Sequence, residues 1–170
     1  MKLSTSYNLI NQYILDKSII LKMTKNLQLK NTNSSRILFH KNIKSKLHIM
    51  LIKHDKKYLG DPFKFKNSKI KTFVLLEGYA KFIFYNNKGN IVNIINFSKK
   101  NSVLIIDESK YFYNQVIKSK NITFFEITNG PFIKKDKKFL FEIVKNFPTT
   151  KNYFQLEARI KNSLKKFSKI

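Results

Sequence analysis

The sequence predicts a mainly β protein, an antiparallel sandwich or barrel with a helical segment at each end. Short apolar runs of strand length recur through the middle of the chain with polar turns between them, a spacing typical of these architectures. In one such run, Phe82 and Phe84 alternate with Lys81, as in a half-buried strand. Residues 86–90, Asn-Asn-Lys-Gly-Asn, then predict a hairpin connection, because Asn and Gly tolerate the positive φ angles of tight turns.

The composition is that of one folded domain. A length of 170 residues allows a substantial core, and 42% hydrophobic and 14% aromatic residues are typical of a chain that folds. The chain has no cysteine, which excludes disulfides, thiolate nucleophiles and cysteine-ligated zinc. Its apolar runs, such as residues 73–76, are far shorter than a membrane span, and the N-terminus lacks the apolar core of a signal peptide. We therefore expect a cytoplasmic protein without a transmembrane segment.

The pattern divides the chain into three parts. Residues 1–33 form an N-terminal helical segment, because apolar side chains recur through residues 4–23 at helical spacing. Residues 34–133 form the β-barrel, and residues 134–170 form a C-terminal helical extension. The strands are predicted at residues 37–39, 47–52, 73–76, 79–85, 91–97, 103–106, 111–117 and 122–127, with a polar, irregular stretch at residues 58–70.

The C-terminal extension predicts two helices. The spacing of Phe139, Ile143 and Phe147 favours a short helix before Pro148. A basic amphipathic helix follows, with an apolar stripe of Phe154, Ile160, Leu164 and Phe167. We interpret this stripe as packing against the domain itself, and docking on a membrane or a partner is the alternative.

The net charge of +24 has two interpretations. It could attract nucleic acid or an anionic membrane surface, or it could reflect a composition rich in Lys, Asn, Ile and Phe. The lysines are spread along the whole chain, and arginine, which suits bidentate phosphate recognition, occurs only at Arg36 and Arg159. We favour the compositional interpretation over nucleic-acid binding. A concave pocket in such a chain should still favour anionic ligands.

Four segments in the middle of the chain, taken in their order, carry a resemblance to known proteins. Residues 71–78, Lys-Thr-Phe-Val-Leu-Leu-Glu-Gly, are similar to the second half of the first cupin motif, in which a metal-binding glutamate precedes a strand and a glycine follows seven residues later. Residues 125–132, Phe-Glu-Ile-Thr-Asn-Gly-Pro-Phe, resemble a characteristic WbuC segment. Upstream, Arg36 and His40 resemble the entry strand of that family. With Phe147-Pro148, the resemblance covers roughly residues 34–148.

The resemblance implies a fold and a biological setting. It implies a cupin-type antiparallel β-barrel, also called a double-stranded β-helix or jelly roll. It also implies a role near surface polysaccharide, such as O-antigen, or near nucleotide-sugar metabolism, and a homodimer formed through the sheets.

The metal ligands of the family are missing from this sequence. The family holds its metal with a His-X-His pair, a glutamate and a later histidine. An ungapped placement puts Lys64, Lys66 and Lys71 at the first three positions, and a shift by one puts Phe63 and Phe65 at the pair instead. The later histidine falls at Phe112 or Tyr113. An ammonium group has no free lone pair, so we expect no metal cofactor.

The remaining histidines are His40, His48 and His54. A rebuilt metal site around His48 and His54 is conceivable, but no carboxylate lies at a fixed spacing from them. We interpret them as ordinary surface or core residues.

Three functions remain open. The first is a degenerate cupin whose barrel binds an anionic sugar or nucleotide-sugar without metal. The alternative is that the lysines point outward and aromatic side chains fill the barrel, which would leave no room for a ligand. The others are a nucleic-acid-binding protein with one contiguous basic face and a non-catalytic scaffold. The candidate ligand-binding residues are Lys64, Lys66, Lys71, Tyr111, Phe112, Tyr113 and Glu126.

Catalysis has less support in the sequence. There is no Gly-rich phosphate loop, no nucleophile elbow and no paired-carboxylate spacing. Glu126 is interpreted as a strand-end residue rather than an acid catalyst. If Lys71 were buried with a depressed pKa, it could act as a base.

Overall fold

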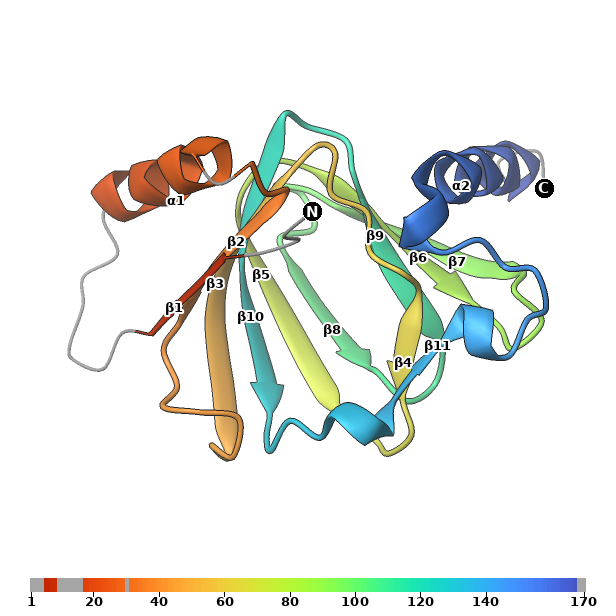
Figure 1. Ribbon diagram of the computed structural model, residues 1–170, viewed down its shortest axis with the longest axis horizontal. Helices are drawn as coiled ribbons and strands as arrows, with labels where there is room; N and C mark the ends of the chain where they lie inside the picture. The colour runs from red at the N-terminus through yellow and green to blue at the C-terminus, as the bar shows by residue number, and fades with distance from the viewer. Residues whose placement is uncertain (1–4, 9–16, 30, 168–170) are drawn as a thin grey trace.

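Two facing β-sheets form the body of the molecule (Figure 1). The computed structural model describes residues 5–8, 17–29 and 31–167, and the strand counts refer to these residues. The six-stranded sheet has the order β1 (Thr5–Asn8), β2 (Ser34–Leu38), β3 (Leu47–Asp55), β10 (Asn121–Asn129), β5 (Ile70–Glu77) and β8 (Val103–Asp107). The five-stranded sheet has the order β11 (Lys137–Phe139), β4 (Phe63–Phe65), β9 (Phe112–Ile117), β6 (Ala80–Tyr85) and β7 (Ile91–Phe97). The named strands pair antiparallel, apart from β1 with β2, so the predicted mainly β, antiparallel architecture is confirmed.

The core between the sheets is built by side chains that alternate along each strand. In β5, Phe73 points inward and is fully buried, whereas Val74 lies on the outer face. The Phe73 ring packs edge-on against Phe82 of β6, with centroids 4.8 Å apart. Phe97 and Phe124 complete this aromatic centre. Each aromatic ring removes a large apolar area from water, so these residues fix how the sheets face each other.

The N-terminal helix lies later in the chain than predicted. It spans Lys17–Leu29 (α1) and packs Met23 against Ile37 and Leu51 on the outer face of the six-stranded sheet. Thr5–Asn8 forms β1 rather than helix, because this segment pairs with β2. Ile10 and Ile14, which contributed to the predicted pattern, lie outside the described residues.

The C-terminal helix α2 (Tyr153–Phe167) packs on the outer face of the five-stranded sheet. Its Leu156 and Ile160 are buried against Tyr85 and Phe112, which project outward from β6 and β9. Phe154, placed on the buried stripe in the sequence analysis, is 83% exposed, because two residues along a helix turn a side chain to the opposite side. Within the described ranges, no helix is long and apolar enough to cross a bilayer.

Two three-residue strands were not predicted from the sequence. β4 and β11 pair with each other through Phe63↔Phe139 and Phe65↔Lys137. They occupy the stretch expected to be irregular and the segment expected to begin a short helix, because three residues are too few for a period-two pattern. In place of the short helix before Pro148, the chain makes a 3-10 turn at Leu140–Glu142. Further 3-10 turns lie at Lys134–Asp136 and Thr150–Asn152.

Two turns depend on glycine. The predicted hairpin is confirmed, with the Asn86 N–H donating to the Asn90 carbonyl at 3.0 Å and Gly89 at φ +78°. Gly78 joins β5 to β6 at φ +92°, and a Cβ there would collide with the Asn121 carbonyl oxygen. Both the backbone angle and the close approach exclude a side chain at Gly78.

Gly78→Ala should therefore lower the free energy of unfolding by about 2 kcal/mol or more. Gly60→Ala is the matched control, because its Cβ would meet only the Tyr58 side chain, at 3.3 Å from the hydroxyl, and its φ is not positive. We expect the control to change stability by less than about 0.5 kcal/mol in urea denaturation. Equal stability of the two variants would contradict the tight approach of β10 to this turn.

Candidate functional site

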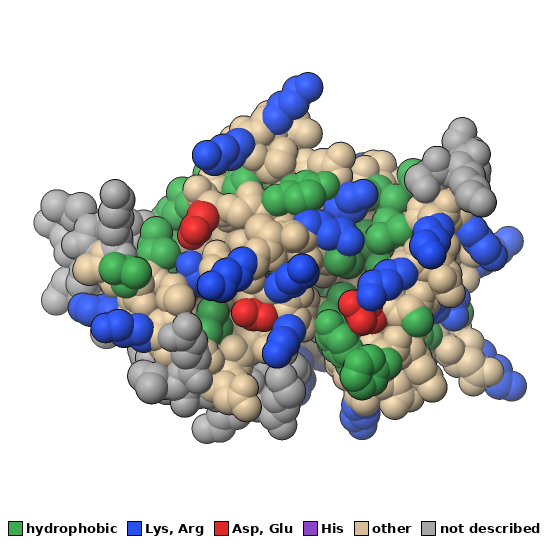
Figure 2. Space-filling model, turned by 90° about the horizontal axis from the view of Figure 1, so that it is seen from above, with side chains coloured by type: hydrophobic (Ala, Val, Ile, Leu, Met, Phe, Trp, Pro, Cys, Tyr) green, Lys and Arg blue, Asp and Glu red, His purple; other side chains and the backbone are tan. Residues whose placement is uncertain are grey.

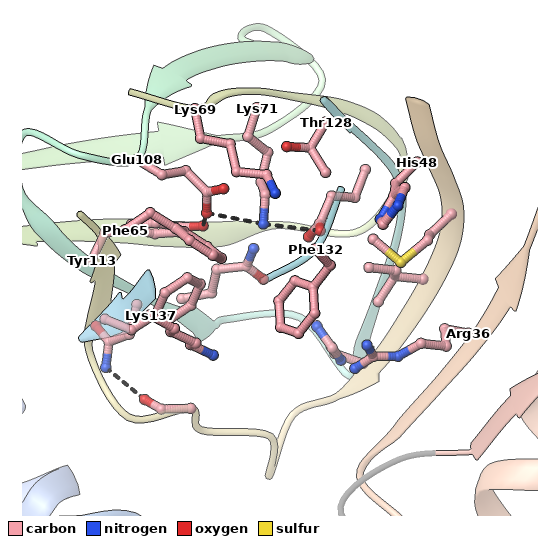
Figure 3. Close-up of a pocket in the computed structure, with 18 of the residues that line it drawn as sticks. Arg36, His48, Phe65, Lys69, Lys71, Glu108, Tyr113, Thr128, Phe132 and Lys137 are labelled. Atoms are coloured by element: carbon pink, nitrogen blue, oxygen red, sulfur yellow. Dashed lines mark hydrogen bonds and ion pairs between the residues drawn. The ribbon is translucent and has the colours of Figure 1, made fainter. Parts of the chain in front are cut away.

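A cavity of about 380 Å³ opens between the two sheets (Figure 3). Its volume lies at the small end of the range for ligand sites, about 300–1,000 Å³. The six-stranded sheet contributes Arg36, His48, Met50, Ile52, His54, Lys71, Glu126 and Thr128 to the lining. The five-stranded sheet contributes Phe63, Phe65, Tyr113, Asn114, Gln115 and Lys137.

A buried ion-paired cluster stands at the centre of one wall. The Lys71 Nζ lies 2.9 Å from Oε1 of Glu126 and 3.0 Å from Oε1 of Glu108. Lys71 is two residues before the buried Phe73 on β5, so its side chain faces inward with that ring. Burial alone would lower the pKa of Lys71, but Glu126 and Glu108 outweigh it and raise the pKa above its ordinary value. Lys71 is therefore a permanent ammonium group at neutral pH.

Tyr113 belongs to the same cluster. Its hydroxyl donates to Oε1 of Glu108, the oxygen that also faces Lys71. Burial, followed by the charges of Glu108 and Glu126, raises the pKa of Tyr113 well above its ordinary value, so the phenol keeps its proton. Glu108 is fully buried, and its Oε2 has no hydrogen-bond partner within the described part of the chain.

Three more cations line the cavity, and none has an ion-pair partner among the described residues. Lys137 places its Nζ 3.7 Å from the centroid of the Phe63 ring. Burial and then the neighbouring Lys71 lower the pKa of Lys137 to about 8. Lys69 donates to the Pro131 carbonyl at 3.2 Å. The Nε of Arg36 is buried without a hydrogen-bond partner in the described structure.

The three histidines also line the cavity and are held as stacked rings. His40 and His48 stack with centroids 4.2 Å apart, and His54 stacks on Tyr58 at 3.6 Å. Burial and then the charge of Arg36 lower the pKa of His54 well below its ordinary value. Burial and then His40 lower the pKa of His48. His48 and His54 are therefore neutral at pH 7.

The residues at the positions where the sequence resemblance places metal ligands do not fit a metal ion. The side chains that face the cavity there are the rings of Phe63 and Phe65, the ammonium of Lys71 and the phenol of Tyr113. Lys71 already places a positive charge between the two carboxylates. Among the described residues, no three His, Asp or Glu side chains are grouped to hold a metal.

The structure brings three of the seven predicted site residues to the cavity: Lys71, Tyr113 and Glu126. The other four lie elsewhere: Lys64 and Phe112 point to the opposite side of their strands, because side chains alternate, and Lys66 and Tyr111 lie just outside β4 and β9. Lys64 projects from the opposite side of β4 and donates to Asn87 at 3.1 Å. Lys66 and Tyr111 are exposed, and Phe112 is buried beneath α2.

One detail of the prediction is wrong, because Glu126 lies in the middle of β10 and not at a strand end. Lys71 is buried, but its pKa is raised because two carboxylates face it, so the condition under which it could act as a base is not met.

Four further residues line the cavity although they were not among the predicted site residues: Arg36, Lys69, Glu108 and Lys137. Lys69 could have been predicted because it lies two residues before Lys71, and residues two apart in an extended chain face the same side. Lys137 gave no such signal, since β11 was not recognised.

No family model and no curated protein matches this sequence. Solved structures do match by shape. A mutant of salicylate 1,2-dioxygenase from Pseudoaminobacter salicylatoxidans, in complex with gentisate, aligns with a TM-score of 0.55 and 9% identity over 74% of this chain and 36% of its own. A structure of CapF with 3-isopropenyl-tropolone aligns with a TM-score of 0.50 and 14% identity over 63% of this chain and 31% of its own.

The capsular polysaccharide assembling protein CapF from Staphylococcus aureus aligns with a TM-score of 0.49 and 15% identity, over 63% of this chain and 32% of its own. The chain thus spans about a third of the length of each of these proteins. These neighbours are cupin-fold proteins, and at such low identity the likeness shows the fold. The cupin-type jelly roll is therefore established for this chain.

Lys71→Ala should lower the free energy of unfolding by about 3–5 kcal/mol, because it leaves Glu108 and Glu126 buried without their shared cation. Lys66→Ala is the control: it removes an exposed lysine that follows β4 and should change the free energy of unfolding by less than about 0.5 kcal/mol. The triple variant Lys71→Met, Glu108→Gln, Glu126→Gln should recover much of the loss, because it leaves no charge in the cluster. Urea denaturation measures all three, and equal stability of the two alanine variants would contradict the role of the cluster.

Proposed function

We propose that this chain is a WbuC-like cupin that binds a small anionic sugar-type ligand without a metal ion, in the cytoplasm, near surface polysaccharide or nucleotide-sugar metabolism. One observation carries the proposal. In a single cavity, Lys71 is neutralised by two carboxylates while Arg36, Lys69 and Lys137 have no ion-pair partner among the described residues. Those three cations are free to meet the charge of a ligand.

The charge of the lining supports an anion. Four cations, Arg36 and three lysines, face three carboxylates in the cavity. The carboxylate of Asp61 is taken up by Thr150, whose N–H and hydroxyl donate to it at 2.6 and 2.8 Å. The glutamates are held by Lys71. A carboxylate or phosphate that enters the cavity can therefore bind the unpaired cations. Such hydrogen bonds are charge-assisted, and they are stronger than those between neutral groups.

The remaining lining suits a sugar. Gln115 and Thr128 offer an amide and a hydroxyl group, and the Oε1 of Gln115 is buried without a partner in the described structure. The rings of Phe65 and Phe132 give flat apolar faces. The volume of about 380 Å³ favours a sugar acid or sugar phosphate over a complete nucleotide-sugar.

The WbuC assignment rests on position. The resemblance places metal ligands at four positions. In the alignment that puts the His-X-His pair at Phe63 and Phe65, all four positions line one cavity. The Phe63 and Tyr113 rings lie 4.9 Å apart, and the Lys71 Nζ lies 5.7 Å from the Phe63 ring. Such convergence is expected if this barrel descends from a metal-holding one.

The basic surface is less suited to carry the function. Figure 2 shows lysine and arginine side chains scattered over the face in view, with tan and green surface between them. Nucleic-acid binding through charge alone favours a contiguous basic face. The exposed apolar side chains of β8, Val103 and Ile105, are the surface through which we expect a homodimer.

Glucuronate and glucose 6-phosphate should raise the melting temperature, and glucose, their uncharged counterpart, should not. Arg36→Gln and Lys69→Gln should each weaken binding by about tenfold or more, since each removes a charge-assisted hydrogen bond. Lys66→Gln removes an exposed lysine outside the cavity and is the control for net charge. Calorimetric titration measures the affinities, and an equal response to glucose, or equal weakening by the control, would overturn the proposal.

The affinity for these anions should fall as the pH rises through about 8. Lys137, with its pKa lowered to about 8, is protonated below that pH and attracts the anion, and it loses its charge above it. Lys137→Gln should bind more weakly at pH 6.5 and show no such step. Titration calorimetry between pH 6.5 and 9 checks this, and a step that persists in the variant would assign it to another group.

A further inference from the structure

Lys137 differs from every other lysine that lines the cavity. Its Nζ lies 3.7 Å from the Phe63 ring centroid and 4.8 Å from that of Phe139, without an ion-pair partner in the described structure. Lys71 has two carboxylate partners, and Lys69 donates to a carbonyl. The ring faces favour a cation weakly, so they hold the Lys137 amine in place without fixing its proton as a carboxylate would.

We propose that Lys137 is an amine nucleophile that captures an anionic carbonyl compound in the cavity as an imine. The inference rests on the proposed function, which supplies the anionic ligand, and it adds that this ligand carries an aldehyde or ketone group. Lysines that form imines need a neutral amine at working pH, and burial among other cations provides it.

The position of Lys137 is fixed by the backbone around it. It lies on β11, whose three residues pair with β4, and the neighbouring Lys66 N–H donates to the Asp136 carbonyl at 2.8 Å. Figure 3 shows Lys137 on the wall opposite Arg36, which comes from β2 of the other sheet. A ligand whose acid group meets Arg36 thus has an amine on the facing wall.

Some of the charges around Lys137 lower its pKa and others raise it. Lys71 and Arg36 disfavour its ammonium form, whereas Glu108 and Glu126 favour it. Burial is the largest influence, and the net effect lowers the pKa of Lys137 from 10.5 to about 8. A substantial neutral fraction is therefore present near physiological pH, which an ordinary lysine lacks.

The step balances without an oxidant or reductant. The Nζ lone pair attacks the carbonyl carbon, a C–N bond forms, and the C–O π electrons move to the oxygen. The carbinolamine then loses its oxygen as water, which leaves with the two protons that the amine nitrogen carried. The product is an imine, and hydrolysis reverses the step.

Reductive trapping tests this inference. The purified full chain is incubated with pyruvate, a small carbonyl acid, and sodium cyanoborohydride, and peptide mass spectrometry locates the resulting 1-carboxyethyl groups. We expect Lys137 to be modified at least about tenfold faster than any other lysine at pH 7.5, because its neutral amine is more abundant. The rate should rise with pH and level off above about 8.

Two variants serve as controls. Lys137→Arg keeps a positive charge but has no nucleophilic amine, so it should abolish the fast modification. Lys138→Arg changes the adjacent residue on β11, which is not part of the cavity lining, and should leave the fast modification intact. Melting curves by circular dichroism confirm that both variants fold.

The outcomes separate the two proposals. Modification spread evenly over the lysines, or unchanged in Lys137→Arg, overturns the imine while anion binding through Arg36 and Lys69 stands. Selective trapping at Lys137 without any binding of glucuronate or glucose 6-phosphate supports the amine and overturns the sugar-acid ligand.

Discussion

The ion-paired cluster of Lys71, Glu108 and Glu126 is the constraint on which the interior depends. Three charges in the wall of a β-barrel are costly unless they satisfy one another, and here one ammonium group serves two carboxylates at 2.9 and 3.0 Å. The cluster joins β5, β10 and the residue that follows β8. It therefore ties three neighbouring strands of one sheet together at the cavity.

The partition of charge in the cavity follows from this cluster. Because Glu108 and Glu126 are paired with Lys71, they do not pair with the cations on β2 and β11, which remain available to bind an anionic ligand. The pKa values of two lysines in the cavity are shifted in opposite directions. Burial lowers both, but Glu126 and Glu108 outweigh it for Lys71, whereas the charge of Lys71 adds to it for Lys137. One cavity thus holds a fixed cation and a titratable one.

The sequence predicted the fold better than the site. The strands with clear alternation, such as β6, and the hairpin at residues 86–90 were predicted, since both depend on neighbouring residues. The site depends on which side of a strand each residue faces, and the sequence left that open at residues 63–66. β4 and β11 are too short to carry a period, so Lys137 could not be placed. Glu108 was visible only as a scattered acid, because its partner Lys71 is far from it along the chain.

Strand β9 is buried on both sides, with Phe112 beneath α2 and Tyr113 in the cavity wall. Most residues of this strand are thus held between two packed layers, whereas several side chains of β7 are exposed to water. The two strands should differ in how freely they can change during evolution. The exposed positions of β7, which do not include the buried Phe97, can change with little consequence, while a replacement in β9 disturbs either the packing beneath α2 or the lining of the cavity. Selection should therefore have left β9 less variable than the exposed part of β7.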